Sequence, residues 1–422
     1  MKKIASLISA ALVAAGVGTS ILRADDANYQ NYVVGERAAG MGGAVTASAD
    51  GVDAVFYNPA GLADVPKNSI SLSASLYGFQ NQWVKGYWYP SQDLDVSSFV
   101  SIPTTFGSVW KLSDRSAVAL AAFIPDRSSS NDLEAFVDTD HYFKFSQEDQ
   151  TLWIGPSIGW RLDEKFSVGA SLFGVYRTFS WFRDYFYANY WLALSEDIMY
   201  SNLSLLAVLG AKYDLDENWL LGLRLQTPNI RLTGKGNYLF KRSYFDSSER
   251  LVYFQSWYMD EVKSLNRLPT QLTAGVAYRV PGVYSFGADV SLHLPVSFNR
   301  VEGYDQFGVY RDWPLERKFT VDLSLGGEYF LADVYPVRLG LFTSRSSAPA
   351  PDVLTSYYPP QINKYGLTAS VGRESENTTI NLGLNYVWGN GKFLGFDQGL
   401  NIDVAEAEYS SLYLFLSSSY LF

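Results

Sequence analysis

Six short polar turns alternate with longer stretches and divide the chain into segments of membrane-strand length. The turns are Leu112–Arg115, Asp163–Lys165, Asp214–Asn218, Val280–Val283, Ala332–Tyr335 and Glu374–Asn377. The longer stretches are Gln80–Val96, Asp126–Asp149, Phe179–Tyr200, Asn229–Leu265, Leu294–Leu315, Ser346–Ile362 and Gly389–Glu408. Six short turns and seven long loops join fourteen strands, and an even number of antiparallel strands can close without a free edge. The pattern predicts an all-β fold, a 14-stranded antiparallel transmembrane β-barrel over residues 68–422.

Alternation of apolar and polar residues is typical of half-buried strands. In Trp219–Gln226 the leucines share one face with the tryptophan, and Arg224 lies on the other face. Phe319–Glu328 and Ile380–Trp388 show the same period of two. A soluble β-sandwich would alternate in the same way, but aromatic residues make up 16% of this chain and charged residues only 18%. That balance favours a membrane barrel, whose aromatic girdles lie at the two interfaces.

Both ends of the chain indicate export to an outer membrane. Lys2 and Lys3 precede an apolar run from Ile4 to about Leu22, and Ala24 is a small residue at the cleavage point, which predicts a signal peptide over residues 1–24. Cleavage after Ser20 and an uncleaved anchor are the alternatives. At the other end, Phe422 closes a strand with one apolar face, and this resembles the signal read by the outer-membrane assembly machinery. We therefore expect a monomeric, multi-pass outer-membrane protein of a diderm bacterium, in contact with membrane lipid.

Residues 25–67 are rich in Gly and Ala, which bury too little apolar surface to build a core but allow close backbone packing. The segment contains Gly35-x-Arg37-x-x-Gly40-x-Gly42, then Ala49-Asp50, and then Tyr57-Asn58-Pro59-Ala60-Gly61. This ordered set resembles the N-terminal plug of the FadL-type outer-membrane family, which takes up long-chain fatty acids and other hydrophobic compounds. The resemblance implies a plug or gate inside the lumen. Its residues would be Gly35, Arg37, Gly40, Gly42, Asn58, Pro59 and Ala60.

The segment Ser116–Pro125 is apolar on both faces, unlike the other predicted strands. We expect an apolar lumen wall on one face, formed by Val118, Leu120, Ala122 and Ile124, because such a patch offers a dry surface to an apolar ligand. In the FadL-type family the third strand bends inward and opens a lateral gap, and this segment is the third strand by our count. The alternative is that its alanines simply make room for the plug.

Two of the predicted outer loops carry many aromatic residues. An exposed apolar patch of that size usually marks a binding surface, and the FadL-type resemblance implies a groove that captures hydrophobic substrate. Its predicted members are Phe182, Tyr185, Phe186, Tyr190, Trp191, Trp257 and Tyr258. Part of the run, including Phe179 and Trp181, is alternatively an interface girdle.

Charged residues suggest a ligand contact but no catalysis. Arg224 is the candidate for a carboxylate head group, because a buried anion needs a partner; the alternative is that it pairs with Asp289 or Asp322. With two histidines and no cysteine, we predict no enzyme, no cofactor and no metal site. Calcium binding at the carboxylates within Asp126–Asp149 is left open beside simple solvation. The net charge of −10 argues against nucleic acid as a partner.

These features predict a passive outer-membrane transporter of hydrophobic molecules, foremost long-chain fatty acids, with capture at the aromatic loops and a lateral opening near the third strand. Uptake of aromatic hydrocarbons fits the same features. A different class, a surface interaction protein such as an adhesin or phage receptor on a sealed barrel, is the competing hypothesis.

Overall fold

The computed structural model describes residues 27–89, 92–136, 141–187, 192–245, 251–302, 314–352, 360–396 and 402–422. The predicted signal peptide lies outside these residues. Among the described residues, none of the helices is long and apolar enough to span a membrane.

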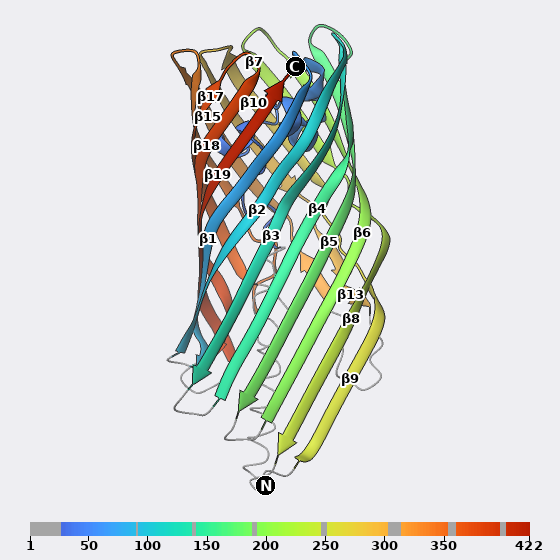
Figure 1. Ribbon diagram of the computed structural model, residues 1–422, viewed down its shortest axis with the longest axis vertical. Coiled ribbons are helices and arrows are strands. Elements are labelled where there is room, and N and C mark those ends of the chain that lie inside the picture. The colour runs from blue at the N-terminus through green and yellow to red at the C-terminus, as the bar shows by residue number, and fades with distance from the viewer. Residues whose placement is uncertain are drawn as a thin grey trace.

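A single antiparallel wall closes on itself, because β1 pairs with both β2 and β19 (Figure 1). The first strands are β1 (Ser69–Tyr89), β2 (Gln92–Ser113), β3 (Ser116–Phe136), β4 (His141–Arg161), β5 (Phe166–Tyr187), β6 (Leu192–Asp214), β7 (Trp219–Gln226), β8 (Ile230–Phe245), β9 (Leu251–Ser264) and β10 (Gln271–Val280). They are followed by β11 (Tyr284–His293), β12 (Val296–Asn299), β13 (Val301–Glu302), β14 (Pro314–Arg317), β15 (Thr320–Leu331), β16 (Tyr335–Ser344), β17 (Gln361–Glu374), β18 (Thr378–Phe396) and β19 (Ile402–Leu421).

Several wall strands are interrupted, so these segments form fourteen strands in the closed barrel, as predicted. β6 pairs first with β7 and farther along with β8, so β7 and β8 are two parts of one wall strand. β9 and β10, β11 to β13, and β14 and β15 continue one another in the chain in the same manner. β12 and β14 pair only with each other, as a separate two-stranded sheet among the described strands.

The six predicted short turns all fall between consecutive wall strands. The predicted long loops were too long, because strand pairing continues into them. β5 and β6, for example, remain paired up to Tyr187 and Leu192, although Phe179–Tyr200 was predicted as a loop. Period-two burial persists through this region, which means that its aromatic residues belong to two faces of a sheet.

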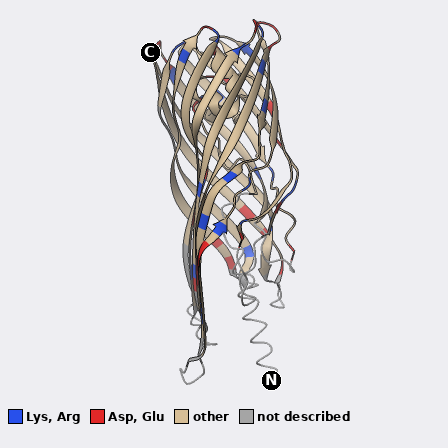
Figure 2. Cartoon of the chain, turned by 90° about the vertical axis from the view of Figure 1, so that its right-hand side faces the viewer, with Lys and Arg blue, Asp and Glu red and all other residues tan. Residues whose placement is uncertain are grey.

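The outer face of the wall is apolar. On β18, Leu382 and Leu384 are exposed while Asn381 and Asn385 point inward and are buried. Aromatic pairs lie near both ends of this face, for example Trp219 with Tyr278 and, on the β18 side, Tyr386 with Trp388. Figure 2 shows charged residues at the rim of short turns and again in the lower half of the wall, with a mostly uncharged stretch between. Such an apolar outer surface fits a lipid environment.

Residues 27–65, called here the luminal segment, lie inside the barrel toward the rim of short turns (Figure 1). The segment contains two short α-helices, α2 (Arg37–Gly40) and α3 (Gly51–Tyr57), and the 3-10 helix η1 (Pro59–Asp64). Asn58 begins η1, since its side chain accepts a hydrogen bond from the Ala60 N–H and the following proline has a fixed φ.

Glycines of the wall make room for the luminal segment. A Cβ atom at each would lie within 3.2 Å of a backbone atom of that segment. These inward glycines, the glycine belt, are Gly159, Gly169, Gly210, Gly222, Gly275, Gly287, Gly326 and Gly340. The backbone of the luminal segment therefore packs directly on the backbone of the wall.

Candidate functional site

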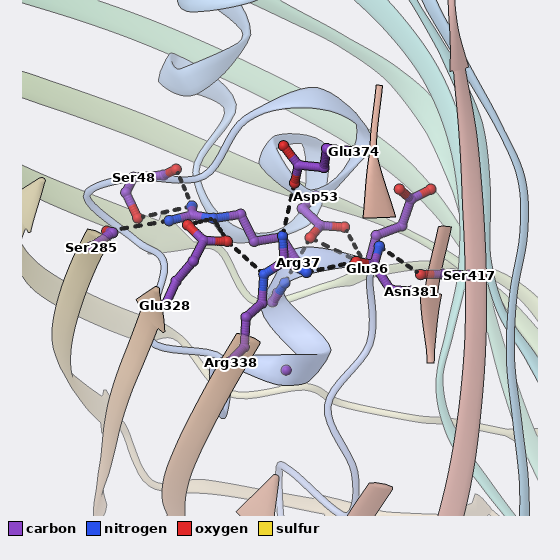
Figure 3. A network of polar contacts seen from close by, with 12 residues as sticks. Glu36, Arg37, Ser48, Asp53, Ser285, Glu328, Arg338, Glu374, Asn381 and Ser417 are labelled. Carbon is purple, nitrogen blue, oxygen red and sulfur yellow. Dashed lines mark hydrogen bonds and ion pairs between the residues drawn. The ribbon is translucent and has the colours of Figure 1, made fainter. Parts of the chain in front are cut away.

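A buried ionic network fastens the luminal segment to the wall (Figure 3). Arg37 Nε lies 3.1 Å from Glu328 Oε1, and its Nη1 donates to the Ser48 carbonyl at 2.9 Å. Arg338 also pairs with Glu328, and its Nη2 lies 3.0 Å from Glu374 Oε1. One carboxylate thus holds two guanidinium groups from different parts of the chain, which fixes the position of α2 against β15 and β16.

The predicted glycines of the segment are held in close contacts. Gly35 has φ +101°, and a Cβ there would lie 2.4 Å from Asp53 Oδ1. Gly42 has φ +63°, and a Cβ would lie 2.9 Å from the Leu341 nitrogen. Both the left-handed backbone and the lack of space favour glycine. Gly40 lies against Ser370 and Arg338 of the wall.

The Asn58-Pro59-Ala60 turn rests on the glycine belt. The Asn58 amide donates to the carbonyls of Thr46 at 2.7 Å and Ala211 at 3.0 Å, which ties two parts of the luminal segment to β6. Pro59 and Ala60 pack against the glycines of β5 and β6.

Two carboxyl groups of the segment are perturbed. Burial, together with the nearby charge of Asp53, raises the pKa of Glu36 to about 7. Burial also raises the pKa of Asp53 to about 6, although hydrogen bonds from the backbone N–H groups of Ala38 and Glu36 oppose the shift.

The wall separates between β2 and β3. Their pairing ends at Thr105 and Phe123. Farther out, β2 continues to pair with β1 and β3 with β4, but the described parts of β2 and β3 no longer pair with each other. We call this gap the split.

Two prolines explain where the split begins. The register that pairs Thr105 with Phe123 would place Pro103 opposite Pro125 on the next rung of the same face. Neither proline has an N–H group to donate to a ladder. The luminal segment replaces one lost partner, because the Tyr32 hydroxyl donates to the Ile124 carbonyl at 2.8 Å. The Gly35 N–H similarly donates to Thr105 Oγ1 at 3.1 Å.

The prediction of which face of the third strand lines the lumen was wrong. Leu120 is 48% exposed and lies on the outer face, and Val118 and Ala122 share that side of the strand and are half-buried. Ile124 is buried, since the register of β3 shifts beyond Phe123. The inward residues are Ala117, Ala119, Ala121 and Phe123. Small alanines face inward because the luminal segment occupies that space.

Beside the split, four rings form an inner aromatic cluster. Phe123 contacts Phe56 and Phe173 with ring centroids 5.2 and 6.2 Å apart, and Trp153 contacts the same two rings at 5.4 and 5.5 Å. Phe56 comes from α3 and the other three from β3, β4 and β5. Sequence reasoning missed this cluster. Its members are far apart in the chain, belong to no short motif and come together only in the fold.

A cavity of about 100 Å³ lies next to this cluster. Phe56 and Trp153 line one side, and Gln226, Gln271 and Arg177 are among the polar residues that line the rest. The first residues of the luminal segment, including Tyr29, complete the lining. This volume is smaller than the roughly 300–1,000 Å³ of typical ligand pockets, so a larger ligand requires the segment to move.

Arg224 of β7 does not line this cavity itself, but it bonds to residues that do. Its Nε donates to the Phe56 carbonyl at 3.0 Å, and its Nη1 and Nη2 donate to the side-chain oxygens of Gln271 and Gln226, each at 2.9 Å. Among the residues that the structure describes, no carboxylate pairs with it. The alternative pairing with Asp289 or Asp322 is wrong, since those groups contact Thr46 and His293 instead.

Arg177, by contrast, is neutralised by Asp149, whose Oδ1 lies 2.9 Å from the arginine Nε. Within the described part of the chain, no group of three or more His, Asp or Glu side chains is placed to hold a metal ion. The calcium alternative falls partly on residues 137–140, outside that part.

Those residues of the predicted outer groove that the structure describes do not share one surface. Phe182 and Phe186 lie on the face of β5 opposite Trp181, and Phe186 stacks on Tyr142. Tyr258 is exposed, while its neighbour Trp257 packs inward. Tyr190, Trp191 and the side chain of Tyr185 lie outside the described residues. Because these segments are strands, adjacent residues point to opposite faces.

The inward face instead carries an outer aromatic cluster. Its rings are Phe179, Trp181, Tyr200, Tyr238 and Phe240, with Trp257 packed against them. Phe179 stacks on Tyr200 with centroids 4.8 Å apart. Phe179 and Trp181, interpreted above as girdle, therefore belong to the inner surface beyond the cavity.

The closed wall, the apolar outer face and the occupied lumen define a membrane-spanning β-barrel with an internal N-terminal segment. No protein-family model matches the sequence, and no curated protein matches it. Solved structures show that the fold is that of FadL homologues and related transporters, as the sequence resemblance predicted.

A FadL homologue from Pseudomonas aeruginosa is 14% identical, with 94% of this chain and 100% of that chain covered at a TM-score of 0.66. The toluene transporter TodX from Pseudomonas putida is 15% identical, with 93% and 99% covered and a TM-score of 0.64. The toluene transporter TbuX from Ralstonia pickettii is 14% identical, with 92% and 98% covered and a TM-score of 0.58. At these identities the likeness concerns the fold.

Proposed function

We propose that this protein is a passive transporter that moves hydrophobic molecules across the outer membrane, with long-chain fatty acids as the foremost substrates. The observation that carries this proposal is the cavity beside the split. It has an aromatic wall on one side and, on the other, two glutamines that bind a buried arginine, for which the described part of the chain offers no carboxylate partner. Such a site suits a molecule with an apolar chain and an anionic end.

The proposed route has three stages. A ligand leaves water at the outer aromatic cluster, where apolar surface provides the driving force. It then enters the cavity when residues 27–34 move, and its chain lies along the inner aromatic cluster. Finally it leaves sideways through the split, in line with the lateral opening that the FadL-type resemblance implies. No step needs an energy source.

In this proposal residues 25–67 act as the plug. The glycine belt and the Arg37–Glu328 contact hold its middle part against the wall. We therefore assign the movement to its first residues and the closure of the straight path to the remainder, which includes the Asn58-Pro59-Ala60 turn.

Ligands extracted with the purified protein and identified by native mass spectrometry test the proposal. We expect long-chain carboxylates to co-purify. The Arg224→Gln variant should then lose more affinity for a fatty acid than for an uncharged hydrocarbon, because it removes the positive charge but retains hydrogen-bonding capacity. Arg115→Gln, in an exposed turn, is the control.

Other outcomes identify the alternatives. Toluene-like ligands, with equal affinity losses in Arg224→Gln, would favour aromatic hydrocarbons, in keeping with the toluene transporters TodX and TbuX that share this fold. Absence of any hydrophobic ligand or uptake, together with surface binding of a macromolecule, would favour the surface interaction protein.

A further inference from the structure

Arg127 spans the split. It lies on β3 just beyond the point where pairing with β2 ends, and its Nη1 donates to the Ser101 carbonyl of β2 at 3.0 Å. Within the described part of the chain, this side-chain bond joins two strand stretches that no longer share ladder hydrogen bonds. A side-chain hydrogen bond thus joins β2 and β3 where strand pairing between them has ended.

The acceptor of Arg127 is neutral. Among the described residues, no carboxylate forms an ion pair with its guanidinium. The neighbouring Asp126 instead accepts a hydrogen bond from Asn31 of the luminal segment, with Asn31 Nδ2 3.2 Å from Asp126 Oδ1. The Arg127 side chain is half-buried and its bond to Ser101 is reached by solvent. Arg127 therefore retains capacity for a transient anion.

The inner aromatic cluster lies between Arg224 and the start of the split. The Arg224 guanidinium lies over the Phe56 ring at 5.6 Å. Phe56 contacts Phe123, and Phe123 is the last residue of β3 that pairs with β2. Apolar rings thus lead from the buried Arg224 to the start of the split, and Arg127 follows four residues farther along β3.

We propose that Arg127 is a specificity-determining residue, which closes the empty split through Ser101 and receives the anionic end of a substrate as that substrate leaves sideways. This inference rests on the proposed function and deepens it. A carboxylate offers the guanidinium a charge-assisted bidentate partner that is stronger than a neutral carbonyl. An anion in the split therefore displaces Ser101 and opens the closing contact, whereas an uncharged molecule of the same length does not.

The test compares uptake of oleate and oleyl alcohol by cells that express the protein and lack another transporter for either. Arg127→Gln should lower the initial rate for oleate by about tenfold, as expected for losing one charge-assisted hydrogen bond. The rate for oleyl alcohol should stay constant or rise. Arg127→Lys should retain most oleate uptake, and Arg115→Gln should affect neither probe. Resistance of the folded barrel to SDS without heating verifies assembly of each variant. The role of Arg127 would be overturned if Arg127→Gln takes up each probe at the wild-type rate, or if it loses the same fraction of the rate for both probes.

A second measurement separates this role from the proposed route. The natural chain has no cysteine, so Ser101→Cys and Ser128→Cys place one thiol on each side of the split, and a bifunctional maleimide can join them. If joining stops uptake of both probes while Arg127→Gln does not discriminate between them, the lateral route stands and the role of Arg127 fails. If joining changes neither rate, the lateral route itself fails. The inference is supported when joining stops both probes and Arg127→Gln selectively slows oleate.

Discussion

The substitution Glu328→Gln tests whether the ionic network holds the luminal segment in place. Glu328 is 6% exposed and accepts from both Arg37 and Arg338. Removing one partner of a buried ion pair costs about 3–5 kcal/mol. Arg338 keeps Glu374, and Arg37 keeps the Ser48 carbonyl, so we expect the lower value, about 3 kcal/mol. That change would raise the undocked fraction of the segment about a hundredfold.

Conductance of the purified protein in planar bilayers measures this fraction, because an undocked segment leaves a water-filled lumen. Glu328→Gln should show more frequent and larger openings, and cells should admit more of a hydrophilic dye. The barrel itself should remain resistant to SDS without heating. Glu302→Gln is the matched control, since its pair with Lys263 is solvent-exposed and such pairs contribute about 0–1 kcal/mol. If Glu328→Gln conducts no more than this control, the network does not anchor the segment.

Three further predictions follow from the described contacts. Ala60→Leu overfills the fully buried contact with the glycine belt at a cost of about 1–3 kcal/mol; uptake should fall while the barrel still assembles, and normal uptake of every hydrophobic compound would contradict a role for this turn. The raised pKa of Glu36, about 7, means that the folded state loses stability as pH rises from the ordinary value of 4.5 to 7. Glu36→Gln should therefore resist thermal unfolding better than the wild type at pH 8, by at most about 3 kcal/mol, and equally well at pH 4; a constant difference across this range would disprove the titration. Replacing Trp181 and Phe240 together by Ser should slow uptake at limiting substrate but not at saturation, whereas Phe254→Ser on the exposed side should not; equal behaviour of the two variants would remove the outer aromatic cluster from capture.

The wall could be predicted from the sequence because turns and alternation are local signals. The short turn at Asp214–Asn218 interrupts a strand pattern that needs no distant partner to be recognised. The outer limits of the strands could not be placed in this way. Beyond the membrane, β5 keeps a period of two but has aromatic residues on both faces, so hydropathy no longer separates strand from loop.

The face of the third strand was predicted wrongly for a related reason. Both faces of Ser116–Pro125 are apolar, and a pattern of period two then gives no preference between them. The distinguishing feature was size, since the alanines face the occupied lumen and Leu120 faces outward. The sequence does contain the two prolines that mark the split, Pro103 and Pro125. They lie opposite each other only in one strand register, and that register cannot be deduced from either strand alone.

The candidate site was harder to predict because its residues meet only through tertiary structure. Arg224 was recognisable as an inward cation from its place in an alternating strand. Its neutral acceptors, Gln271 and the Phe56 carbonyl, come from other parts of the chain. No spacing rule connects them, so neither the cavity nor the neutral surroundings of Arg224 could be deduced.

The glycine belt has a consequence for how the molecule is made. The luminal segment packs backbone to backbone against eight strands, which leaves no space for it to thread into a finished cylinder. The seam between β1 and β19 joins residues at opposite ends of the barrel sequence, such as Ser69 and Leu421. Contacts of such long range form late in folding. We therefore expect the barrel to close around a segment that is already in place. The luminal segment would then act as a template for assembly of the wall that encloses it.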